Sequence, residues 1–375
     1  MQTKAITMVI RSLLGGGAER VMTDMANFWV AKGHAVHIIT STSPETDAYP
    51  LDPRVGRSML PPSGNRTFPW SIKELRAEIL RIGAPVVVSF MDRTNVPLIL
   101  ACRGIPVKTI IAERIDPTAQ HVPLLRKFIV RVCYQYADAL TVLTDNVKHE
   151  WAERFLPASK VFSIPNPVPV VTREGQLPAW LPKKYFCCTG RLHQQKGFDQ
   201  LLDYMPGILK RYPEHHLVIM GEGSERKALT AQIHRLGLED RVHMPGFISM
   251  PHAIMKHADL FLFPSRYEGF PNALVEAMSL GLPVVSFDCP SGPRCIIKDK
   301  INGRLLPAND MVSFTEAVHW MMENDQRRQL MGQHAQTICQ THSMERVMNA
   351  WEHIIDHLCG YRIPEPNFLW HQETV

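Results

Sequence analysis

The chain has 375 residues, of which 45% are hydrophobic and 21% are charged. This length exceeds one ordinary hydrophobic core, so two domains are expected, and the composition is that of a folded globular protein. The eight cysteines form no C-x-x-C pair and no H-E-x-x-H occurs, which argues against a zinc site or a disulfide framework. The N-terminus does not resemble a signal peptide and no long apolar run occurs, so a cytoplasmic protein without a transmembrane helix is expected.

The net charge of +5 is unevenly distributed along the chain. Residues 1–165 carry 20 Lys+Arg and 14 Asp+Glu, whereas the remaining residues carry 21 and 22. An anionic partner for the first half would explain this excess of basic residues, although the excess can also be without function. Nucleic acid is disfavoured, because there is no basic stripe with interleaved aromatic residues. A membrane surface or a phosphate-bearing substrate fits better.

The first half alternates short apolar runs with helical spacing. Continuous β-branched runs separated by helices are typical of a parallel sheet that is covered on both faces. Strands are predicted at 5–10, 34–40, 85–90, 108–113 and 139–144, and helices at 17–33, 71–82 and 122–137. The proline-dense stretch 161–171 is typical of a linker, so the first domain is predicted to span residues 1–165.

The same alternation then begins again, which predicts a second doubly wound α/β domain over residues 166–359 and a tail over 360–375. Strands are predicted at 185–190, 216–221, 241–246, 259–264 and 283–287, and helices at 197–211, 224–236, 271–280, 311–322 and 342–359. In such sheets ligands bind at the carboxyl ends of the strands, so the loops that follow strands are the places to look for chemistry.

Two glycine-containing loops are candidates for contact with a phosphate or a sugar. G-G-G-A-E-R (15–20) follows a strand and opens a helix, so Gly16 and Gly17 would let the backbone approach a ligand closely. It is not a dinucleotide fingerprint, because Arg20 stands where a third glycine is needed. Gly246 and Phe247 follow a later strand and could lie beside a nucleobase. An ordinary tight turn remains the alternative for both loops.

T-G-R-L-H-Q-Q-K-G-F-D (189–199) also follows a predicted strand. It places Arg191 and Lys196 at the carboxyl end of that strand, where two cations are suited to binding a diphosphate. They would matter most as negative charge grows on a departing diphosphate. The alternative is a solvated loop with ordinary surface charges.

Y-E-G-F-P-N-A-L-V-E-A (267–277) places two carboxylates on either side of a turn that opens a helix. Glu276 is suited to accept hydrogen bonds from the vicinal hydroxyls of a ribose, and Glu268 would lie near a sugar. Backbone N–H groups at the helix start would point toward a diphosphate. The turn consists of Gly269, Phe270, Pro271 and Asn272. Helix capping with a surface acid is the alternative.

The joint occurrence of these motifs, in this order, resembles the retaining glycosyltransferases of family 4, which have the GT-B fold. The resemblance runs from G-G-G-A-E-R-V through Q-Q-K-G-F-D to Y-E-G-F-P-N-A-L-V-E-A and I-N-G-R-L-L-P. S-F-M-D-R-T-N (89–95) and S-G-P-R-C-I-I-K-D (291–299) are similar to a branch that builds bacterial surface polysaccharides, lipopolysaccharide and lipid-linked oligosaccharides. Many relatives carry Glu where this chain has Cys295, which leaves the role of that position open.

The resemblance implies two Rossmann-like domains that face each other across a cleft. It implies retaining transfer of a hexose or N-acetylhexosamine from a nucleotide-sugar, with a UDP-sugar favoured over GDP-mannose, to a glycan acceptor that is lipid-linked. Arg191 and Lys196 would bind the donor diphosphate, Glu276 the ribose and Glu268 the transferred sugar. The sequence has no D-x-D, so no metal and no other cofactor is expected.

The acceptor is expected in the first domain of this fold. Asp92, Glu113 and Arg114 follow predicted strands there and are candidates for positioning it, with structural roles as the alternative. The stretch 121–136 mixes apolar, aromatic and basic residues at helical spacing. It is either an interfacial helix or a helix with one face in the core and its arginines and lysine in water. Peripheral attachment to the inner face of the cytoplasmic membrane is therefore a hypothesis.

Two other functions remain open from the sequence. A sugar-nucleotide 2-epimerase shares this architecture but transfers nothing to an acceptor, and a catalytically inactive protein would only bind the nucleotide-sugar. Consumption of the donor separates all three. The sequence does not specify the donor sugar, the acceptor, the linkage or the oligomeric state.

Overall fold

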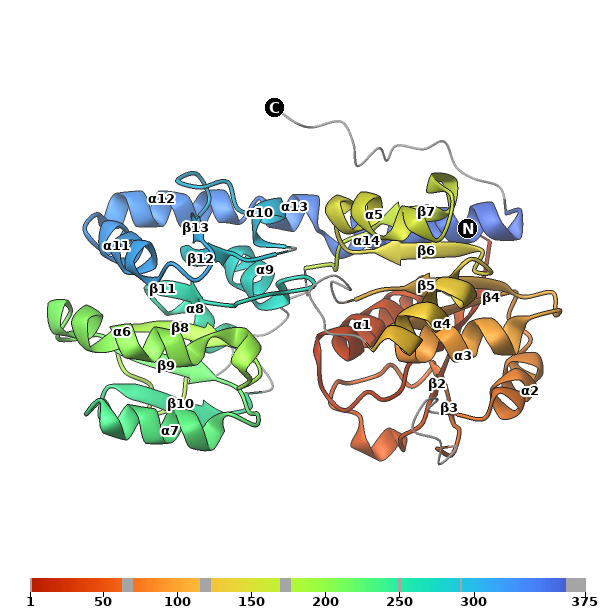
Figure 1. Ribbon diagram of the computed structural model, residues 1–375, viewed down its shortest axis with the longest axis horizontal. Helices are drawn as coiled ribbons and strands as arrows, with labels where there is room; N and C mark the ends of the chain where they lie inside the picture. Colours follow the sequence, from red (N-terminus) through yellow and green to blue (C-terminus); the bar gives the residue numbers. More distant parts are fainter. Residues whose placement is uncertain are drawn as a thin grey trace. The chain divides into compact units, whose positions relative to one another are not determined.

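The computed structural model describes residues 2–62, 70–114, 123–168, 177–248, 251–290 and 292–361 (Figure 1). The chain forms two compact units. Unit 1 contains residues 1–167 together with 344–375, and unit 2 contains residues 168–343. Each unit is built on one sheet of parallel strands with helices packed against it, so the two doubly wound domains that the sequence predicts are confirmed.

Unit 1 has a seven-stranded sheet with the order β3-β2-β1-β4-β5-β6-β7. Its strands are β1 (Ala5–Val9), β2 (Ala35–Thr40), β3 (Gly56–Met59), β4 (Val86–Phe90), β5 (Lys108–Ala112), β6 (Ala139–Val142) and β7 (Val161–Ser163). Its helices are α1 (Gly17–Ala31), α2 (Ile72–Ile82), α3 (Asp92–Cys102), α4 (Leu124–Tyr134), α5 (Asp145–Glu150) and α14 (Met344–Cys359), with 3-10 turns η1 (Pro44–Thr46), η2 (Ala152–Arg154) and η3 (Ala158–Lys160).

The sheet of unit 1 is covered on both faces by apolar side chains. Ile6, Met8 and Val88 pack with Trp29 of α1 and Trp351 of α14 in one cluster. On the other face β-strand residues pack with α2 and α3; this cluster includes Val9, Ile39, Val87, Leu75 and Leu98. Successive residues of a strand therefore serve opposite faces, as the period of two requires.

The last helix corrects the predicted domain boundary. Helix 342–359 was expected to close the second domain, but α14 belongs to unit 1. The Trp351 ring is fully buried, 6.3 Å from the Phe90 ring, and the Lys4 Nζ lies 2.7 Å from Asp356 Oδ1. An amphipathic pattern shows that a helix has an apolar face but not which sheet that face covers, which explains the error. The predicted tail lies outside the described residues from position 362 onward.

Unit 2 has a six-stranded sheet with the order β10-β9-β8-β11-β12-β13. Its strands are β8 (Tyr185–Thr189), β9 (His216–Met220), β10 (Val242–Gly246), β11 (Leu260–Phe263), β12 (Val284–Asp288) and β13 (Arg304–Pro307). The 3-10 turn η4 (Gln194–Lys196) precedes the helices α6 (Phe198–Arg211), α7 (Arg226–Arg235), α8 (His252–Lys256), α9 (Asn272–Ser279), α10 (Pro293–Ile296), α11 (Met311–Met322), α12 (Asp325–Ala335) and α13 (Ile338–Thr341).

The strand order reverses once in each unit, between β1 and β4 in unit 1 and between β8 and β11 in unit 2. Loops that follow the two strands at such a point diverge and leave room at the carboxyl ends. In unit 2 these are the loops that carry the predicted diphosphate-binding residues and the two carboxylates. The fold therefore places the candidate residues where ligands bind in open α/β sheets.

Candidate active site

A partly buried ion pair lies at the carboxyl edge of the unit 2 sheet. Lys196 ends η4, after β8, and Glu268 lies in the loop after the neighbouring strand β11. The Lys196 Nζ is 2.6 Å from Glu268 Oε1, and the Glu268 residue is only 5% exposed. Two residues that the sequence assigns to the site, 72 positions apart, are thus in direct contact.

Arg266 holds the two loops of this ion pair together. Its guanidinium donates to both carboxylate oxygens of Asp199 at 2.7 and 2.8 Å and to the Gln194 carbonyl at 2.6 Å. The Gln195 side chain in turn donates to the Tyr267 carbonyl at 2.9 Å. Sequence reasoning missed this positioning role, because no local pattern connects an arginine after one strand with an aspartate in a helix far upstream.

Two close backbone approaches at this edge require glycine. Gly197 has φ +68°, and a Cβ there would lie 2.1 Å from the Pro264 carbonyl oxygen. Gly221 has φ +150°, and a Cβ there would lie 1.9 Å from the Gly190 carbonyl oxygen. Because only glycine fits both the conformation and the space, these positions let the loops after β8, β9 and β11 pack against one another.

The start of α9 presents backbone donors beside the ion pair. Asn272 is its first residue, and it follows Pro271 without a side-chain cap. The N–H groups of Gly269, Phe270 and Ala273 donate to no backbone carbonyl of the described residues. Unpaired N–H groups and the helix dipole make such a start favourable for a negatively charged group. That a diphosphate lies at this turn stays a prediction.

Glu276 lies one turn further along α9 and is 8% exposed. Its Oε2 is 3.4 Å from the Nε2 atom of His252, which is also buried and lies on α8. The sequence did not single out His252, because a lone histidine in a short helix carries no pattern. Its ring limits how the Glu276 carboxylate can be placed.

The other predicted donor-binding residues of unit 2 lie at the same edge without touching the ion pair. Arg191 follows β8, and its exposed side chain makes no ion pair with a described residue. Gly246 ends β10 with φ +96°, and its carbonyl accepts from the Gly221 N–H at 2.8 Å. Phe247 is 58% exposed.

Two cysteines lie near the site and differ in exposure. Cys289 follows β12 and is fully buried, and burial together with the charge of Glu268 raises the pKa of its thiol. Such a thiol stays neutral and acts as a small apolar residue. Cys295, at the position where many relatives are expected to carry Glu, is exposed on α10, and its role stays open.

Gly16 and Gly17 belong to unit 1. Gly16 precedes α1 in an extended conformation, and α1 begins at Gly17. A Cβ at Gly16 would lie 2.4 Å from Glu19 Oε2, so a side chain there would displace that carboxylate. That carboxylate ends a flexible side chain that can move aside, so this approach alone does not require glycine, and contact of this loop with a donor stays a prediction.

Asp92 and Glu113 follow β4 and β5, which are neighbours in the unit 1 sheet. The Asp92 Oδ1 is 2.5 Å from Nη2 of Arg126. Glu113 is buried and its Oε1 accepts hydrogen bonds from Tyr134 Oη and from Asn95 Nδ2. Burial, with a smaller contribution from the charge of Asp92, raises the pKa of Glu113 to about 8. Glu113 is therefore mostly protonated at pH 7.

Arg114 is buried in unit 1 beside aromatic rings. Its Nη1 donates to Asn166 Oδ1 at 3.0 Å, and its guanidinium carbon lies 4.0 Å from the centre of the Phe90 ring. Burial lowers the pKa of Arg114 to about 9. The Nε and Nη2 atoms of Arg114 are buried and have no hydrogen-bond partner among the described residues, so both the acceptor-positioning role and the structural alternative stay predictions.

A cavity of about 960 Å³, here called the unit 1 cavity, lies at the carboxyl ends of β1, β2, β4 and β5. Asp92 and Glu113 are both among its lining residues, whereas Arg114 is not. Cationic side chains outnumber acidic ones around it; they are Arg11, Arg93, Arg126, Lys127, Arg131 and Arg154 against Glu19, Asp92 and Glu113.

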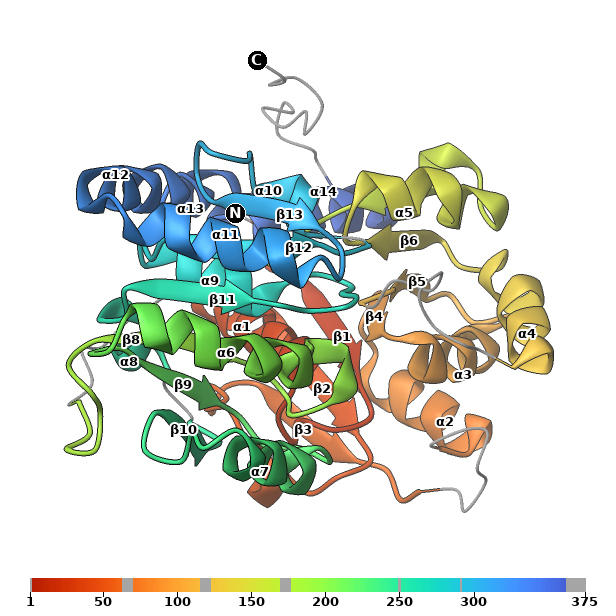
Figure 2. The same ribbon diagram turned by 60° about the vertical axis from the view of Figure 1, so that its left-hand side comes forward.

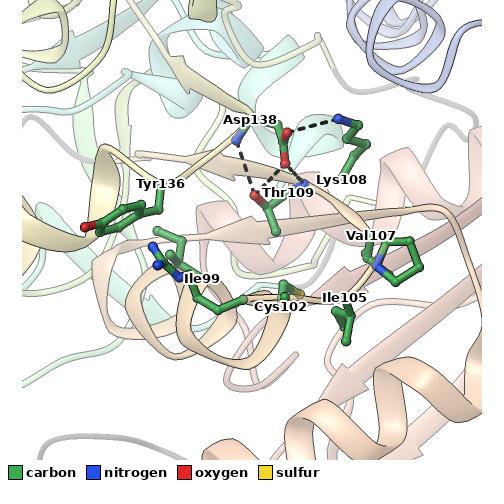
Figure 3. A pocket seen from close by; sticks show the side chains of 11 residues that line it. Ile99, Cys102, Ile105, Val107, Lys108, Thr109, Tyr136 and Asp138 are labelled. Atoms are coloured by element: carbon green, nitrogen blue, oxygen red, sulfur yellow. Dashed lines mark hydrogen bonds and ion pairs between the residues drawn. The ribbon is translucent and has the colours of Figure 1, made fainter.

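A smaller hollow of about 270 Å³ lies at the opposite end of β5 (Figure 3). Its polar groups are engaged with one another. The Asp138 carboxylate is 3.4 Å from Lys108 Nζ and accepts from the Thr109 N–H at 2.9 Å, and Arg103 lies over the Tyr136 ring. A hollow at the amino end of a strand whose polar groups are already paired is a poor candidate for a catalytic site.

Two further features concern the part of the chain that the structure describes. No group of three or more His, Cys, Asp or Glu side chains there has an arrangement that could hold a metal ion. No helix there is both long enough and apolar enough to cross a bilayer.

Comparisons with known proteins match both halves of the chain. Residues 175–338 match the model of glycosyl transferases group 1, and residues 15–171 match that of glycosyltransferase family 4. An N-acetylgalactosaminyltransferase of Campylobacter jejuni that acts on a diphospho-undecaprenol-linked glycan is 26% identical, over 93% of this chain and 98% of its own. A lipopolysaccharide 1,6-galactosyltransferase of Salmonella typhimurium is 34% identical over 46% and 49%.

The fold is also found among solved structures. HepE of Anabaena, solved with UDP-glucose, has a TM-score of 0.77 with 17% identity, covering 95% of this chain and 99% of its own. The matched models, the parallel sheets of both units and the contact between Lys196 and Glu268 all agree with the resemblance drawn from the motifs. The chain therefore belongs to glycosyltransferase family 4, has the GT-B fold and is a transferase of the hexosyltransferase type.

Proposed function

We propose that this protein is a retaining, metal-independent glycosyltransferase of bacterial polysaccharide or glycan biosynthesis. It transfers a hexose or N-acetylhexosamine from a nucleotide-sugar, preferring a UDP-sugar to GDP-mannose, to a lipid-linked glycan. The observation that carries the proposal is the partly buried ion pair between Lys196 and Glu268, which lies beside the unpaired N–H groups at the start of α9.

Different residues of unit 2 bind different parts of the donor. Lys196, Arg191 and the N–H groups of Gly269 and Phe270 bind the diphosphate, so that positive charge faces the oxygens on which negative charge grows. Glu268 fixes the Lys196 ammonium and contacts the transferred sugar. Glu276, oriented by His252, accepts hydrogen bonds from the ribose hydroxyls.

The base of the nucleotide lies near Gly246 and Phe247, and the Gly16–Gly17 turn approaches the sugar or the diphosphate. Support for uracil as the base comes from HepE, which has a similar fold and was solved with UDP-glucose. The acceptor binds unit 1, with Asp92 and Glu113 available to hydrogen-bond its hydroxyls. Support for a lipid-linked acceptor comes from the Campylobacter jejuni relative.

The chemistry requires no side-chain base. The bond between the anomeric carbon and the diphosphate oxygen breaks, and the acceptor oxygen bonds to that carbon from the same face. The acceptor proton passes to the oxygen of the departing diphosphate. Lys196 and Arg191 take the role that a divalent cation has in transferases with carboxylate-held metals.

We further propose that the protein is peripherally attached to the inner face of the cytoplasmic membrane. The basic excess of residues 1–165 and the membrane-embedded nature of a lipid-linked acceptor support this location.

A thermal-shift panel with UDP, GDP and ADP, with and without EDTA, tests the donor half of the proposal. A ligand that binds only the folded state raises the melting temperature by mass action. We expect stabilisation by UDP and UDP-sugars that EDTA does not change. With the acceptor present, release of UDP would report turnover. An anomeric proton of the product that has the same axial or equatorial orientation as in the donor, measured by NMR, would establish retention. An inverted product would contradict it.

A further inference from the structure

The chain passes between the two units twice, and both crossings lie next to one residue, His342. Pro167 ends the first segment of unit 1, and Met344 begins its second segment. The N–H of Val168, the first residue of unit 2, donates to the His342 carbonyl at 2.8 Å. Ser343 alone separates His342 from Met344. One backbone hydrogen bond within unit 2 therefore connects the two crossings.

The side chain of His342 contacts the turn that precedes α9. Its ring centre lies 6.0 Å from that of Phe270, and the two ring planes are tilted by 33°. Aromatic rings at such a separation attract each other. Phe270 is only 6% exposed, and Thr341 Oγ1 lies 2.8 Å from His342 Nδ1, so the orientations of both rings are constrained. One residue thus joins the candidate donor turn to the crossings.

The short helix α13, which ends just before His342, also contacts the far end of α9. The Cys339 thiol donates to the Ser279 carbonyl oxygen at 3.6 Å, and the His342 N–H donates to the Ile338 carbonyl at 2.9 Å. Figure 2 shows α13 and α9 as neighbours in unit 2. Because α9 carries Glu276 and presents unpaired N–H groups at its start, α13 and His342 support the helix on which the proposed donor contacts depend.

We propose that His342 is a positioning residue, which couples occupancy of the donor turn to the two crossings between the units. A nucleotide bound to the N–H groups of Gly269 and Phe270 restrains the Phe270 ring, and this ring acts on His342. The hydrogen bond from Val168 and the single-residue link to α14 extend the effect to both crossings. This inference rests on the proposed function and adds to it a residue outside the donor site on which turnover depends.

Hydrogen exchange of the full chain, measured by mass spectrometry with and without UDP, tests the coupling directly. In wild type we expect UDP to slow exchange at residues 266–276 and also at the crossing segments 164–168 and 338–344. In His342→Ala, UDP should still slow exchange at residues 266–276, but it should change exchange at the crossing segments by less than about twofold.

Three outcomes of the exchange experiment would overturn the inference. Protection restricted to residues 266–276 in wild type would show that the donor turn and the crossings are not coupled. Protection of the crossing segments that persists in His342→Ala would show that the coupling does not pass through this residue. Absence of any protection by UDP would overturn the proposed function and this inference with it, so the two failures give different results.

Kinetics separate this coupling from a purely structural role. We expect His342→Ala to lower kcat about tenfold and to change the affinity for UDP by less than about threefold, because a residue that couples two regions does not itself contact the ligand. His342→Phe restores a ring beside Phe270 and should recover most of the lost turnover. An equal loss in both variants would contradict the role of the ring contact. A lower melting temperature with unchanged kcat per folded molecule would overturn the proposal in favour of a structural role.

A double-mutant cycle tests whether His342 acts through Phe270. Phe270→Leu removes the partner ring, so adding His342→Ala to it should lower kcat by less than about twofold further. Multiplication of the two separate losses would mean that the residues act independently and would overturn the coupling. His334→Ala, which removes an exposed histidine of α12 in the same unit, is the matched control and should leave kcat and exchange at the crossings unchanged. A loss equal to that of His342→Ala would contradict the proposal.

Discussion

Each unit has a cluster in which a lysine contacts carboxylates. The cluster of unit 1 lies at the amino ends of the strands, and the cluster of unit 2 lies at their carboxyl ends. In unit 1, Lys4 immediately precedes β1 and lies 2.7 Å from Asp356 and 3.9 Å from Glu352, both on α14. In unit 2, Lys196 follows β8 and lies 2.6 Å from Glu268. The chemical groups are the same and both lysines are largely buried, yet only the second cluster lies where open α/β sheets bind ligands.

The partners of each cluster explain the difference. Glu352 also lies 3.2 Å from Lys32 and 3.8 Å from His34, so the unit 1 cluster is a closed network that fastens α14 to β1 and α1. Burial alone would raise the pKa of Glu352, but its interactions with His34, Lys32 and Lys4 outweigh burial and lower the pKa. The loops around Lys196, by contrast, are held by Arg266, which contacts Asp199 and the Gln194 carbonyl and is not part of the ion pair itself.

Removing the unit 2 lysine should have the largest effect on activity. We expect Lys196→Ala to lower kcat by about 10³-fold, because a preorganised cation near the growing charge of the leaving group contributes that much. The melting temperature should also fall, because Glu268 is left buried without its cation, so turnover is expressed per folded molecule. Steady-state UDP release and a thermal melt on the same preparation measure both quantities. Near-normal turnover would remove Lys196 from the mechanism.

Removing the unit 1 lysine should have the opposite outcome. Lys4→Met leaves Asp356 buried without the lysine that it pairs with, which should lower the free energy of unfolding by about 3–5 kcal/mol. Turnover per folded molecule should stay within about twofold of wild type. Urea denaturation gives the first value and active-site-normalised kinetics the second. A specific loss of kcat in a stable Lys4→Met protein would break the distinction between the two clusters.

Arg266 should show an intermediate behaviour as a positioning residue. Arg266→Ala removes the bidentate contact with Asp199, so Lys196 and Glu268 lose alignment and kcat should fall about tenfold. Stability should fall by less than about 1 kcal/mol, because both partners are partly exposed. Lys184→Ala, which breaks the exposed ion pair with Glu214 in the same unit, is the matched control. A change in KM alone would indicate direct donor contact instead.

The pH dependence of stability should distinguish Glu113 from these paired carboxylates. Its folded-state pKa, about 8, is above its unfolded value, so between about pH 4.5 and 8 the unfolded chain has lost a proton that the native protein retains. This group therefore makes stability fall as pH rises through that window. Glu113→Gln should flatten the decline in urea melts at several pH values. Glu352, whose pKa is lowered, contributes stability that is lost as pH falls through its folded pKa.

The sequence predicted the strands with continuous apolar runs, because their burial on both faces leaves a plain pattern. It missed β3, which consists of G-R-S-M. It also missed β13, in which Arg304 and Pro307 flank two leucines. It assigned β7 to the proline-rich linker, because three edge residues beside a proline carry little signal. Helix α3 was missed because Pro97 interrupts its pattern.

The residues of the candidate site were likewise predicted only in part. Lys196, Glu268 and Glu276 were predicted because each follows a strand in a distinctive motif, and the structure joins the first two. Arg266, Asp199 and His252 were not found, because their roles depend on contacts between distant segments that no local spacing encodes. Helix α4 was also ambiguous, since an amphipathic pattern does not say which of its apolar residues enter the core and which, such as Leu124, stay exposed.

Isothermal titration of UDP in the presence of EDTA tests the central claim most directly, on wild type, Glu276→Ala and Lys4→Met. The claim is that the carboxyl edge of unit 2 binds the nucleotide without a metal. We expect UDP to bind wild type and Lys4→Met with equal affinity and to bind Glu276→Ala at least about tenfold more weakly. Wild-type protein that binds UDP only after addition of a divalent cation, or equal affinity in Glu276→Ala, would contradict it.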